Sequence, residues 1–323
     1  MTLGQYFKNK IDEIKWILKD PLLAFVIAII WISLFLFIIF PIFEAIKLSL
    51  LPEGNFSFYV YKRIFTEKIL RRTLINSLSL GLIVACTGTI VGFLFAYTIN
   101  RTNVPLKGFL KVIALLPIIS PPFMLALSVI LLFGKNGLIS NQLLHLESFN
   151  IYGLKGLILV QTMGLFPIAY LVLSGILQSI NPDLENAALN LGASKLKTFL
   201  SVTIPLSAPG IAGAWLLVFV ESLADFGNPM VLSGRFDVLS VQAYLQFTGM
   251  GDLPKGAGLA IILLIPTLSA FIIQKYWISK KSYITITGKP SGARIISINP
   301  ILRFALLFLC LIPSFSILLF YIT

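Results

Sequence analysis

The sequence "ENAALNLGASKLKTFLSVTIPLSAPG" occupies residues 185–210, between two long apolar stretches of the chain. It contains two lysines, together with proline, glycine and several polar side chains. Lysine is unfavourable in a hydrocarbon environment, so this segment predicts a solvent-exposed loop between two buried stretches. The organisation of the chain on either side of this loop decides the fold.

The composition indicates that lipid surrounds most of the chain. Hydrophobic residues make up 57% of it, charged residues 12%, and the mean hydropathy is +0.94, whereas soluble domains are about one-quarter charged. The net charge is +12, but the basic residues form short clusters beside apolar stretches, where they set membrane orientation. We therefore expect an integral membrane protein and no nucleic-acid partner.

Seven apolar stretches approach the ~20 residues that a helix needs to cross the hydrocarbon core. These stretches are apolar throughout, whereas the strands of a membrane barrel alternate apolar and polar residues. We expect an all-α, polytopic bundle in membrane lipid, whose first stretch lacks a cleavage site and stays as an anchor. The stretches cover residues 22–43, 74–99, 112–133, 156–178, 207–232, 257–278 and 302–322.

Lysine and arginine predict a cytoplasmic N-terminus. This orientation divides the chain into a cytoplasmic segment 1–21, a six-span unit 22–278 with an inner loop 181–206, a basic linker 279–301 and a seventh span 302–323. The linker carries Lys280, Lys281, Lys289 and Arg294, whereas the outer loops 134–155 and 233–256 carry only Lys135, Lys155, Arg235 and Lys255.

One outer loop does not follow this rule. Residues 44–73 would lie outside the membrane, yet they contain Lys47, Lys62, Arg63, Lys68, Arg71 and Arg72. The positive-inside bias is weaker in long loops, so the cytoplasmic N-terminus remains the prediction.

The inner loop predicts two short helices joined by a bend. Asn181 can cap the first helix, Pro182 suits its first turn, and Gly192 can adopt the left-handed conformation that stops it. Ser194 can cap the second helix, which runs toward Pro205, where the missing N–H interrupts helical hydrogen bonding. An apolar stripe follows both helices: Leu184, Ala187, Ala188 and Leu191, then Leu196, Phe199, Leu200 and Thr203. Such a pair fits either an interfacial element on lipid headgroups or a docking element for a cytoplasmic partner.

The same loop resembles a known family motif. Asn186-Ala187-Ala188, then Gly192-Ala193, and Pro205 thirteen residues after the glycine are similar to the EAA loop of type I ABC importer permeases. The resemblance implies that this loop couples to an ABC ATPase subunit. It also implies further partners, namely an extracytoplasmic solute-binding protein and a second permease subunit or half, in the inner membrane of a prokaryote.

The loop departs from the motif at one position. Asn186 occupies the place of the family's glutamate, whereas Glu185 lies one residue earlier and points about 100° around the helix. Either Glu185 replaces the missing charge contact with the ATPase, or Asn186 keeps only a hydrogen bond.

The resemblance extends over about residues 60–280. "ALLPIISPPFMLALSVILLFGKNGLIS" (114–140) and "VESLADFGNPMVLSG" (220–234) are similar to stretches of ferric-iron and organophosphate permeases. The implied function is the transmembrane subunit of an ATP-driven importer of ferric iron. Phosphonate or sugar phosphate is the alternative cargo, and an ion-coupled secondary carrier is the alternative mechanism.

Glu221 and Asp225 are the carboxylates deepest in the apolar sequence, four residues apart. Because an unpaired buried carboxylate costs several kcal/mol, intramembrane acids usually face a bundle interior or a water path. They predict either a lining for the translocation path, where carboxylate oxygen suits a hard cation, or a structural pair at a broken helix near Gly227 and Pro229.

No residue pattern indicates a cofactor, a metal centre or catalysis. His145 is the only histidine, and Cys86 and Cys310 lie inside apolar stretches, where cysteine behaves as a small hydrophobe. The sequence contains no Gly-x-x-x-x-Gly-Lys-Ser/Thr loop, so we expect a separate subunit to hydrolyse ATP.

The seventh span begins like the first. "DPLLAF" (20–25) and "NPILRF" (299–304) both introduce an apolar stretch on the cytoplasmic side. Permeases resembling this one are often tandem fusions, so we expect the seventh span to lie outside the six-span unit, as the start of a second permease half or as an accessory helix.

Overall fold

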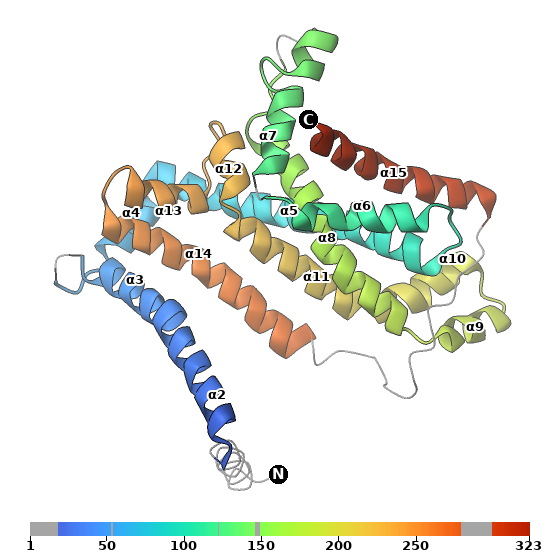
Figure 1. The fold of residues 1–323 in the computed structure, drawn as a ribbon, viewed down its shortest axis with the longest axis horizontal. Helices are drawn as coiled ribbons and strands as arrows, with labels where there is room; N and C mark the ends of the chain where they lie inside the picture. The colour runs from blue at the N-terminus through green and yellow to red at the C-terminus, as the bar shows by residue number, and fades with distance from the viewer. Residues whose placement is uncertain (1–18, 53, 122, 146–148, 279–298) are drawn as a thin grey trace.

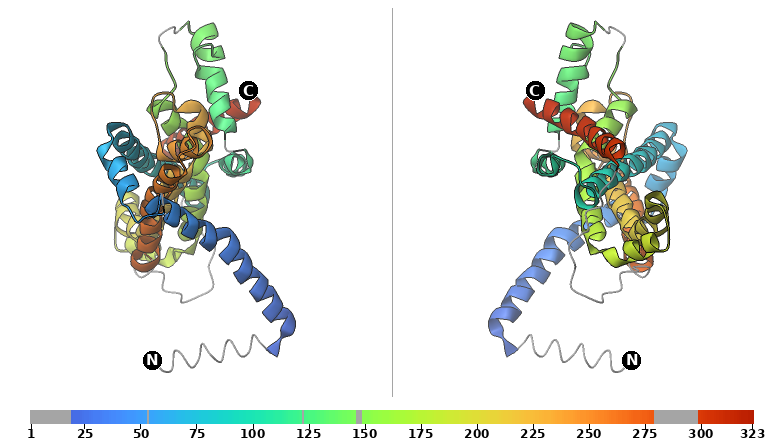
Figure 2. Two further views of the ribbon diagram at one scale, coloured as in Figure 1. Left: turned by 90° about the vertical axis from the view of Figure 1, so that its left-hand side faces the viewer. Right: turned by 90° about the vertical axis from the view of Figure 1, so that its right-hand side faces the viewer.

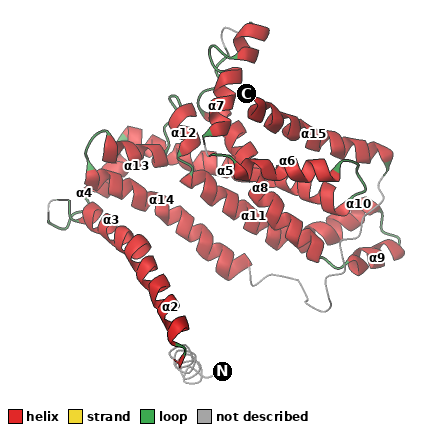
Figure 3. Cartoon of the chain, viewed as in Figure 1, coloured by secondary structure: helices red, strands yellow, loops and turns green. Residues whose placement is uncertain are grey.

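The described part of the chain is helical throughout. The computed structural model describes residues 19–52, 54–121, 123–145, 149–278 and 299–323, and these residues contain helices and connections but no strand (Figure 3). Seven helical segments are long and apolar enough to cross a membrane. The predicted all-α fold is confirmed. The basic linker 279–301 falls almost entirely outside the described residues.

The described helices are numbered in chain order. Their bounds are α2 Pro21–Leu34, α3 Phe40–Leu50, α4 Tyr59–Thr66, α5 Lys68–Arg101, α6 Lys107–Ile119, α7 Met124–Phe133, α8 Leu154–Ser179, α9 Pro182–Asn190, α10 Lys195–Thr198, α11 Ile204–Ala224, α12 Gly227–Leu232, α13 Leu239–Thr248, α14 Leu253–Ile273 and α15 Pro300–Ile322. Four π-helical segments continue a neighbouring turn or helix: η1 Phe35–Ile39, η2 Leu138–Leu143, η3 Phe199–Thr203 and η4 Gln274–Ile278.

Helices α5, α8 and α11 form the centre of the bundle (Figure 1). Gly81 and Gly88 of α5 lie against Phe219 and Val218 of α11, and Gly92 lies against α8. A Cβ on Gly92 would approach the Cβ of Ala169 to 2.6 Å and the backbone nitrogen of Tyr170 to 2.8 Å. The glycines therefore permit close helix crossings, as small residues commonly do in membranes.

Two predicted spans are broken. The span 112–133 is divided into α6, which ends at Ile119, and α7, which begins at Met124, and Figure 1 shows the two helices running in different directions. Proline restricts its own backbone and that of the preceding residue, which explains the break at this Ser-Pro-Pro sequence. The span 207–232 is divided at Asp225, between α11 and α12.

The first span stands apart from the bundle. Figure 2 shows α2 leaving the remaining helices at an incline, and none of its most apolar window is buried. Only its second part, α3, packs on the bundle, mainly against α14.

The last span packs differently from the first. Helix α15 contacts α5, α6 and α7, and its Cys310, Ile317 and Phe320 belong to the main core cluster. The Tyr321 hydroxyl donates a hydrogen bond to the backbone oxygen of Leu116, 3.0 Å away. The seventh span is therefore part of the packed bundle, and its assignment to a second permease half remains a prediction.

The Gly92→Ala substitution should destabilise the bundle by about 1–3 kcal/mol, because the added methyl group overpacks the crossing of α5 and α8. Gly175→Ala on α8 is the matched control, since its Cβ would meet no heavy atom within 4 Å and alanine favours the helix. Thermal unfolding in detergent tests both variants. Equal unfolding temperatures for the two variants would contradict a close contact between α5 and α8 at Gly92.

Candidate functional site

The predicted inner loop forms one end of the bundle, where α9 and α10 lie beyond the last turns of α5 and α8 (Figure 1). Both predicted N-caps are confirmed. The Asn181 side chain accepts a hydrogen bond from the backbone N–H of Asp183 at 2.9 Å, and Ser194 accepts one from Lys197 at 3.2 Å. These caps satisfy N–H groups that have no partner inside the helix.

Gly192 ends α9 in the left-handed conformation that the sequence predicts, with φ +85°. The N–H of Gly192 bonds to the carbonyl of Leu189 at 2.9 Å, and the N–H of Ala193 bonds to Ala188 at 3.0 Å. This pair of bonds is the Schellman motif, which is favourable for glycine because it has no Cβ. The turn sets the direction in which the chain enters α10.

Glu185 of α9 faces the bundle and is buried. Its Oε1 lies 3.1 Å from Nη2 of Arg101, the last residue of α5, and accepts a 2.7 Å hydrogen bond from the Thr203 hydroxyl. The exposed fractions of the two charged side chains are 0% for Arg101 and 2% for Glu185. One carboxylate therefore connects α9 to α5 and to the segment that leads into α11.

The ion pair is only partly satisfied by protein groups. Nε and Nη1 of Arg101 and Oε2 of Glu185 are buried and have no hydrogen-bond partner in the described part of the chain. The hydroxyls of Thr98 and Thr198 are also buried and have no hydrogen-bond partner in the described part of the chain. Removal of either charge would leave the other in a site with few compensating contacts, which is strongly unfavourable.

The apolar stripe of α9 faces away from the bundle. Leu191 is 89% exposed and Leu184 is 48% exposed, and Ala187 is exposed between them. Asn186 and Ala188 are partly exposed. This arrangement is the reverse of an ordinary surface helix, in which apolar residues face the core and charged residues face solvent.

The second stripe is divided between two directions. Leu196 and Leu200 are exposed, whereas the Phe199 ring lies 5.0 Å from that of Tyr97, and Thr203 bonds to Glu185. The second helix does not end at Pro205. Residues 195–224 form one continuous helical segment, because Pro205 lies in the first turn of α11 after a π-helical turn, where its missing N–H is tolerated.

The carboxylates Glu221 and Asp225 lie in different surroundings, although they are only four residues apart. Helix α11 ends at Ala224, and Asp225 has an extended backbone that turns its side chain inward. Asp225 accepts hydrogen bonds from Gln161 of α8 and from the side chain of Asn228, both at 2.8 Å. Glu221 is exposed, and its carboxylate makes no hydrogen bond or ion pair with the described residues.

The bonds of Asp225 stabilise the break between α11 and α12. Its Oδ1 accepts the backbone N–H of Asn228 at 3.2 Å, and its own backbone oxygen accepts the Ser240 hydroxyl at 2.8 Å. The buried Gln161 receives a further bond from Ser222 at 2.6 Å. The geometry thus gives Asp225 a structural role and leaves Glu221 as the free carboxylate.

Sequence reasoning missed Arg101 and Gln161. Arg101 follows the long apolar stretch 74–99, and nothing in the local sequence pairs it with the loop that contains Glu185. Gln161 interrupts the apolar stretch 156–178, and a polar residue at such depth needs a partner. Neither partner is close in sequence, so the pattern alone does not identify the pairs.

The described residues contain no cluster of three or more His, Cys, Asp or Glu side chains that could hold a metal ion. Cys86 and Cys310 are free thiols. His145 lies at the end of η2 with φ +50°.

The Glu185→Ala substitution should destabilise the protein by about 3–5 kcal/mol, because it leaves the Arg101 guanidinium buried and unpaired. The double variant Arg101→Met, Glu185→Leu should recover most of this loss. Asp183→Ala is the matched control, since it removes an exposed carboxylate from the first turn of the same helix and should cost no more than about 1 kcal/mol. The free energy of unfolding in mixed micelles is measured for the wild type and for the three variants. Equal destabilisation by both single variants would contradict the importance of the pair.

Comparison with known proteins identifies the family. Residues 88–283 match the family described as binding-protein-dependent transport system inner membrane component. FbpB 1 of Haemophilus influenzae, named as a ferric transport system permease, is 36% identical over 262 residues, which cover 79% of this chain and 41% of that protein. The ferric transport system permease protein FbpB of Actinobacillus pleuropneumoniae is 34% identical over 283 residues, or 86% and 41% of the two chains.

This chain therefore spans about two-fifths of the length of these curated relatives. Among solved structures, a chain of a bacterial alginate ABC transporter, in complex with an alginate pentasaccharide-bound periplasmic protein, has a TM-score of 0.66. It is 20% identical, and the match covers 85% of this chain and 99% of that one. At this identity the likeness establishes the fold. Since the family match covers more than half of the sequence and the bundle has the matching fold, the chain belongs to the inner membrane components of binding-protein-dependent ABC transport systems.

Proposed function

We propose that this chain is a permease half of an ATP-driven importer and that α9 and α10 dock on an ATPase subunit. The observation that carries the proposal is the reversed helix α9: its Leu184 and the Leu191 that follows it are exposed, while its Glu185 is buried. An exposed apolar stripe on a loop between membrane spans requires a partner, and a cleft in a cytoplasmic ATPase fits it. ATP hydrolysis belongs to that separate subunit.

The contacts of α9 suggest how movement of the ATPase reaches the membrane. The Arg101–Glu185 pair joins α9 to α5, and the Thr203–Glu185 bond joins it to the segment continuous with α11. Displacement of α9 therefore acts on two central helices at once. Rigid-body movement of packed helices is a common way for such proteins to open alternately to the two sides.

The docking surface orients the molecule. ATP is available in the cytoplasm, so the end with α9 faces the cytoplasm, and the predicted cytoplasmic N-terminus agrees with this orientation. The opposite end then faces the extracytoplasmic solute-binding protein, across the inner membrane of a prokaryote. Two ATPase subunits need two docking surfaces, and the described residues provide one, so a second permease half completes the transporter.

Ferric iron is the proposed cargo. The names of the relatives from Haemophilus and Actinobacillus support it, and so does Glu221, an exposed carboxylate on a helix of the central bundle. Ferric iron is a hard cation, and hard cations favour oxygen ligands. Glu221 would line the path between the two permease halves, whereas Asp225 would hold the break between α11 and α12 in place.

The Leu191→Asp substitution should abolish ATPase docking and iron uptake together, because a charge replaces the apolar side chain that is most exposed on α9. The protein should remain folded, since Leu191 makes little contact with the bundle. Asn190→Asp adds the same charge one residue away on an exposed position and should retain docking. The assay is co-purification of the ATPase subunit with each variant. Normal co-purification with Leu191→Asp would contradict the docking role.

The Glu221→Gln substitution should lower uptake of radiolabelled ferric iron by about tenfold, the equivalent of roughly 1.4 kcal/mol, while protein abundance and ATPase docking stay normal. Asp225→Asn should instead reduce the amount of folded protein, because it weakens the bonds with Gln161 and Asn228. The wild-type transporter is assayed in parallel with radiolabelled ferric iron and with radiolabelled phosphonate or sugar phosphate. Uptake of an organophosphate but not of ferric iron would show that the cargo is an anion.

A further inference from the structure

The basic residues of the outer loop 44–73 are not explained by membrane orientation or by coupling. At the end of the bundle opposite α9, one of them lies beside residues from two connections, α7–α8 and α12–α13. Arg72 near the start of α5, Lys135 after α7 and Arg235 after α12 line one cleft of about 790 Å³. The length of α5 separates this cleft from the Arg101–Glu185 pair by roughly 40 Å.

The cleft is cationic and has no internal counter-charge. Arg72, Lys135 and Arg235 are exposed, and none of them makes an ion pair with another described residue. The other described residues of its lining are neutral: Asn150, Tyr152, Gly153, Gly234 and Phe236. Three cations around one hollow attract an anion more strongly than separated surface charges do.

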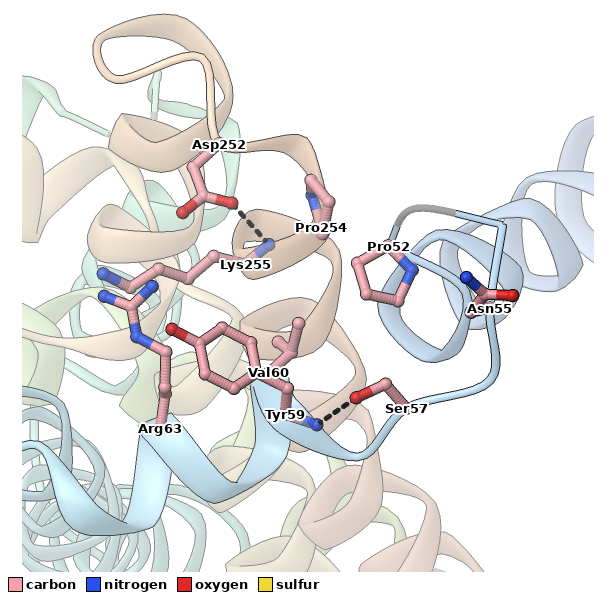
Figure 4. Close-up of a pocket in the computed structure, with 9 residues that line it drawn as sticks. All are labelled: Pro52, Asn55, Ser57, Tyr59, Val60, Arg63, Asp252, Pro254 and Lys255. Atoms are coloured by element: carbon pink, nitrogen blue, oxygen red, sulfur yellow. Dashed lines mark hydrogen bonds between the residues drawn. The ribbon is translucent and has the colours of Figure 1, made fainter.

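A neighbouring pocket at the same end provides the contrast. Figure 4 shows Arg63 of α4 and Lys255 of α14 directed into one space of about 470 Å³. Glu67 forms ion pairs with both, at 2.5 Å from Arg63 and 3.7 Å from Lys255, and the hydrogen bond from Arg63 holds the pKa of Glu67 below its usual range. Asp252 supplies a second negative charge and caps α14 by accepting the N–H of Lys255. The cations of this neighbouring pocket are therefore matched by carboxylates, whereas those of the cleft are not.

The residues that line the cleft come from several elements at this end of the bundle, and not from one helix alone. The N–H of Gly153, before α8, bonds to the carbonyl of Leu232, at the end of α12, at 2.9 Å. Gln161 of the Asp225 network lies about 12 Å further along α8. The cleft thus covers the helices that surround this network, where a cargo-delivering partner would sit.

We infer that this cleft receives carboxylate side chains of the solute-binding protein and holds that protein over the bundle. The inference rests on the proposed importer function, which places this end outside the cytoplasm. A lipid phosphate is the competing occupant. A lysine or arginine that reaches a headgroup extends along the flank of its own helix. These three cations come instead from α5 and from the α7–α8 and α12–α13 connections, and they line one cleft.

The test uses the assembled transporter, with its ATPase subunits and second permease half, in liposomes of zwitterionic lipid. The probe is the iron-loaded solute-binding protein from the same organism, and the readout is its half-saturating concentration for stimulating ATP hydrolysis. Arg72→Glu and Arg235→Glu should raise this concentration at least about tenfold and reduce its dependence on salt, without changing basal or saturated hydrolysis. Arg71→Glu is the matched control, since Arg71 is also exposed but does not line the cleft.

Equal half-saturating concentrations for Arg71→Glu and Arg72→Glu would overturn the docking site. An effect of Arg72→Glu that appears only when anionic lipid is added would assign the cleft to headgroups and also overturn it. A wild-type transporter that hydrolyses ATP without responding to any binding protein would contradict the importer function itself. Loss of response in the variants alone concerns only the cleft, so the two failures are distinguishable.

Discussion

The ion pair between Arg101 and Glu185 determines how the end of the bundle that carries α9 is built. Burying two charges costs several kcal/mol for each ion, and their attraction offsets this cost only when the geometry is good. The 3.1 Å contact, with a further bond from Thr203, fixes which side of α9 faces the bundle. Because the carboxylate is held inside, Leu184 and the Leu191 that follows the helix are left outside. The surface proposed to dock the ATPase is therefore a consequence of where one charge is buried.

Helix α5 connects this pair to the rest of the molecule. Its glycines allow α8 and α11 to pack closely along its length, its last residue holds α9, and Arg72 near its first turn lines the basic cleft. A straight, closely packed helix transmits displacement with little loss, since protein interiors have low compressibility. The two proposed partner surfaces, one for an ATPase and one for a binding protein, thus lie at opposite ends of a single rigid element.

The breaks in the spans place polar groups inside an apolar bundle. Between α6 and α7 and at Asp225, the helical hydrogen bonds stop, and non-helical backbone at membrane depth is tolerated only where it is buried or lines a cavity. The bonds of Asp225 with Gln161 and Asn228 satisfy one break. Glu221, one turn before it, keeps an unbonded carboxylate. The separation of these two acids into a structural and a free group makes Glu221 the better candidate for contact with cargo.

The sequence by itself determined the features that depend on neighbouring residues. Long apolar stretches predicted the spans, and Asn181, Gly192 and Ser194 predicted the ends of α9 and α10, because capping involves groups only a few positions apart. The resemblance of Asn186-Ala187-Ala188 and Gly192 also indicated the family. Only the tertiary structure decided which face of α9 is buried, because Glu185 and Arg101 are 84 residues apart. The same applies to Asp225 and Gln161, 64 residues apart, and to the convergence of Arg72, Lys135 and Arg235. Helical periodicity defines the faces of each helix, but the packing of distant segments selects the partner of each face.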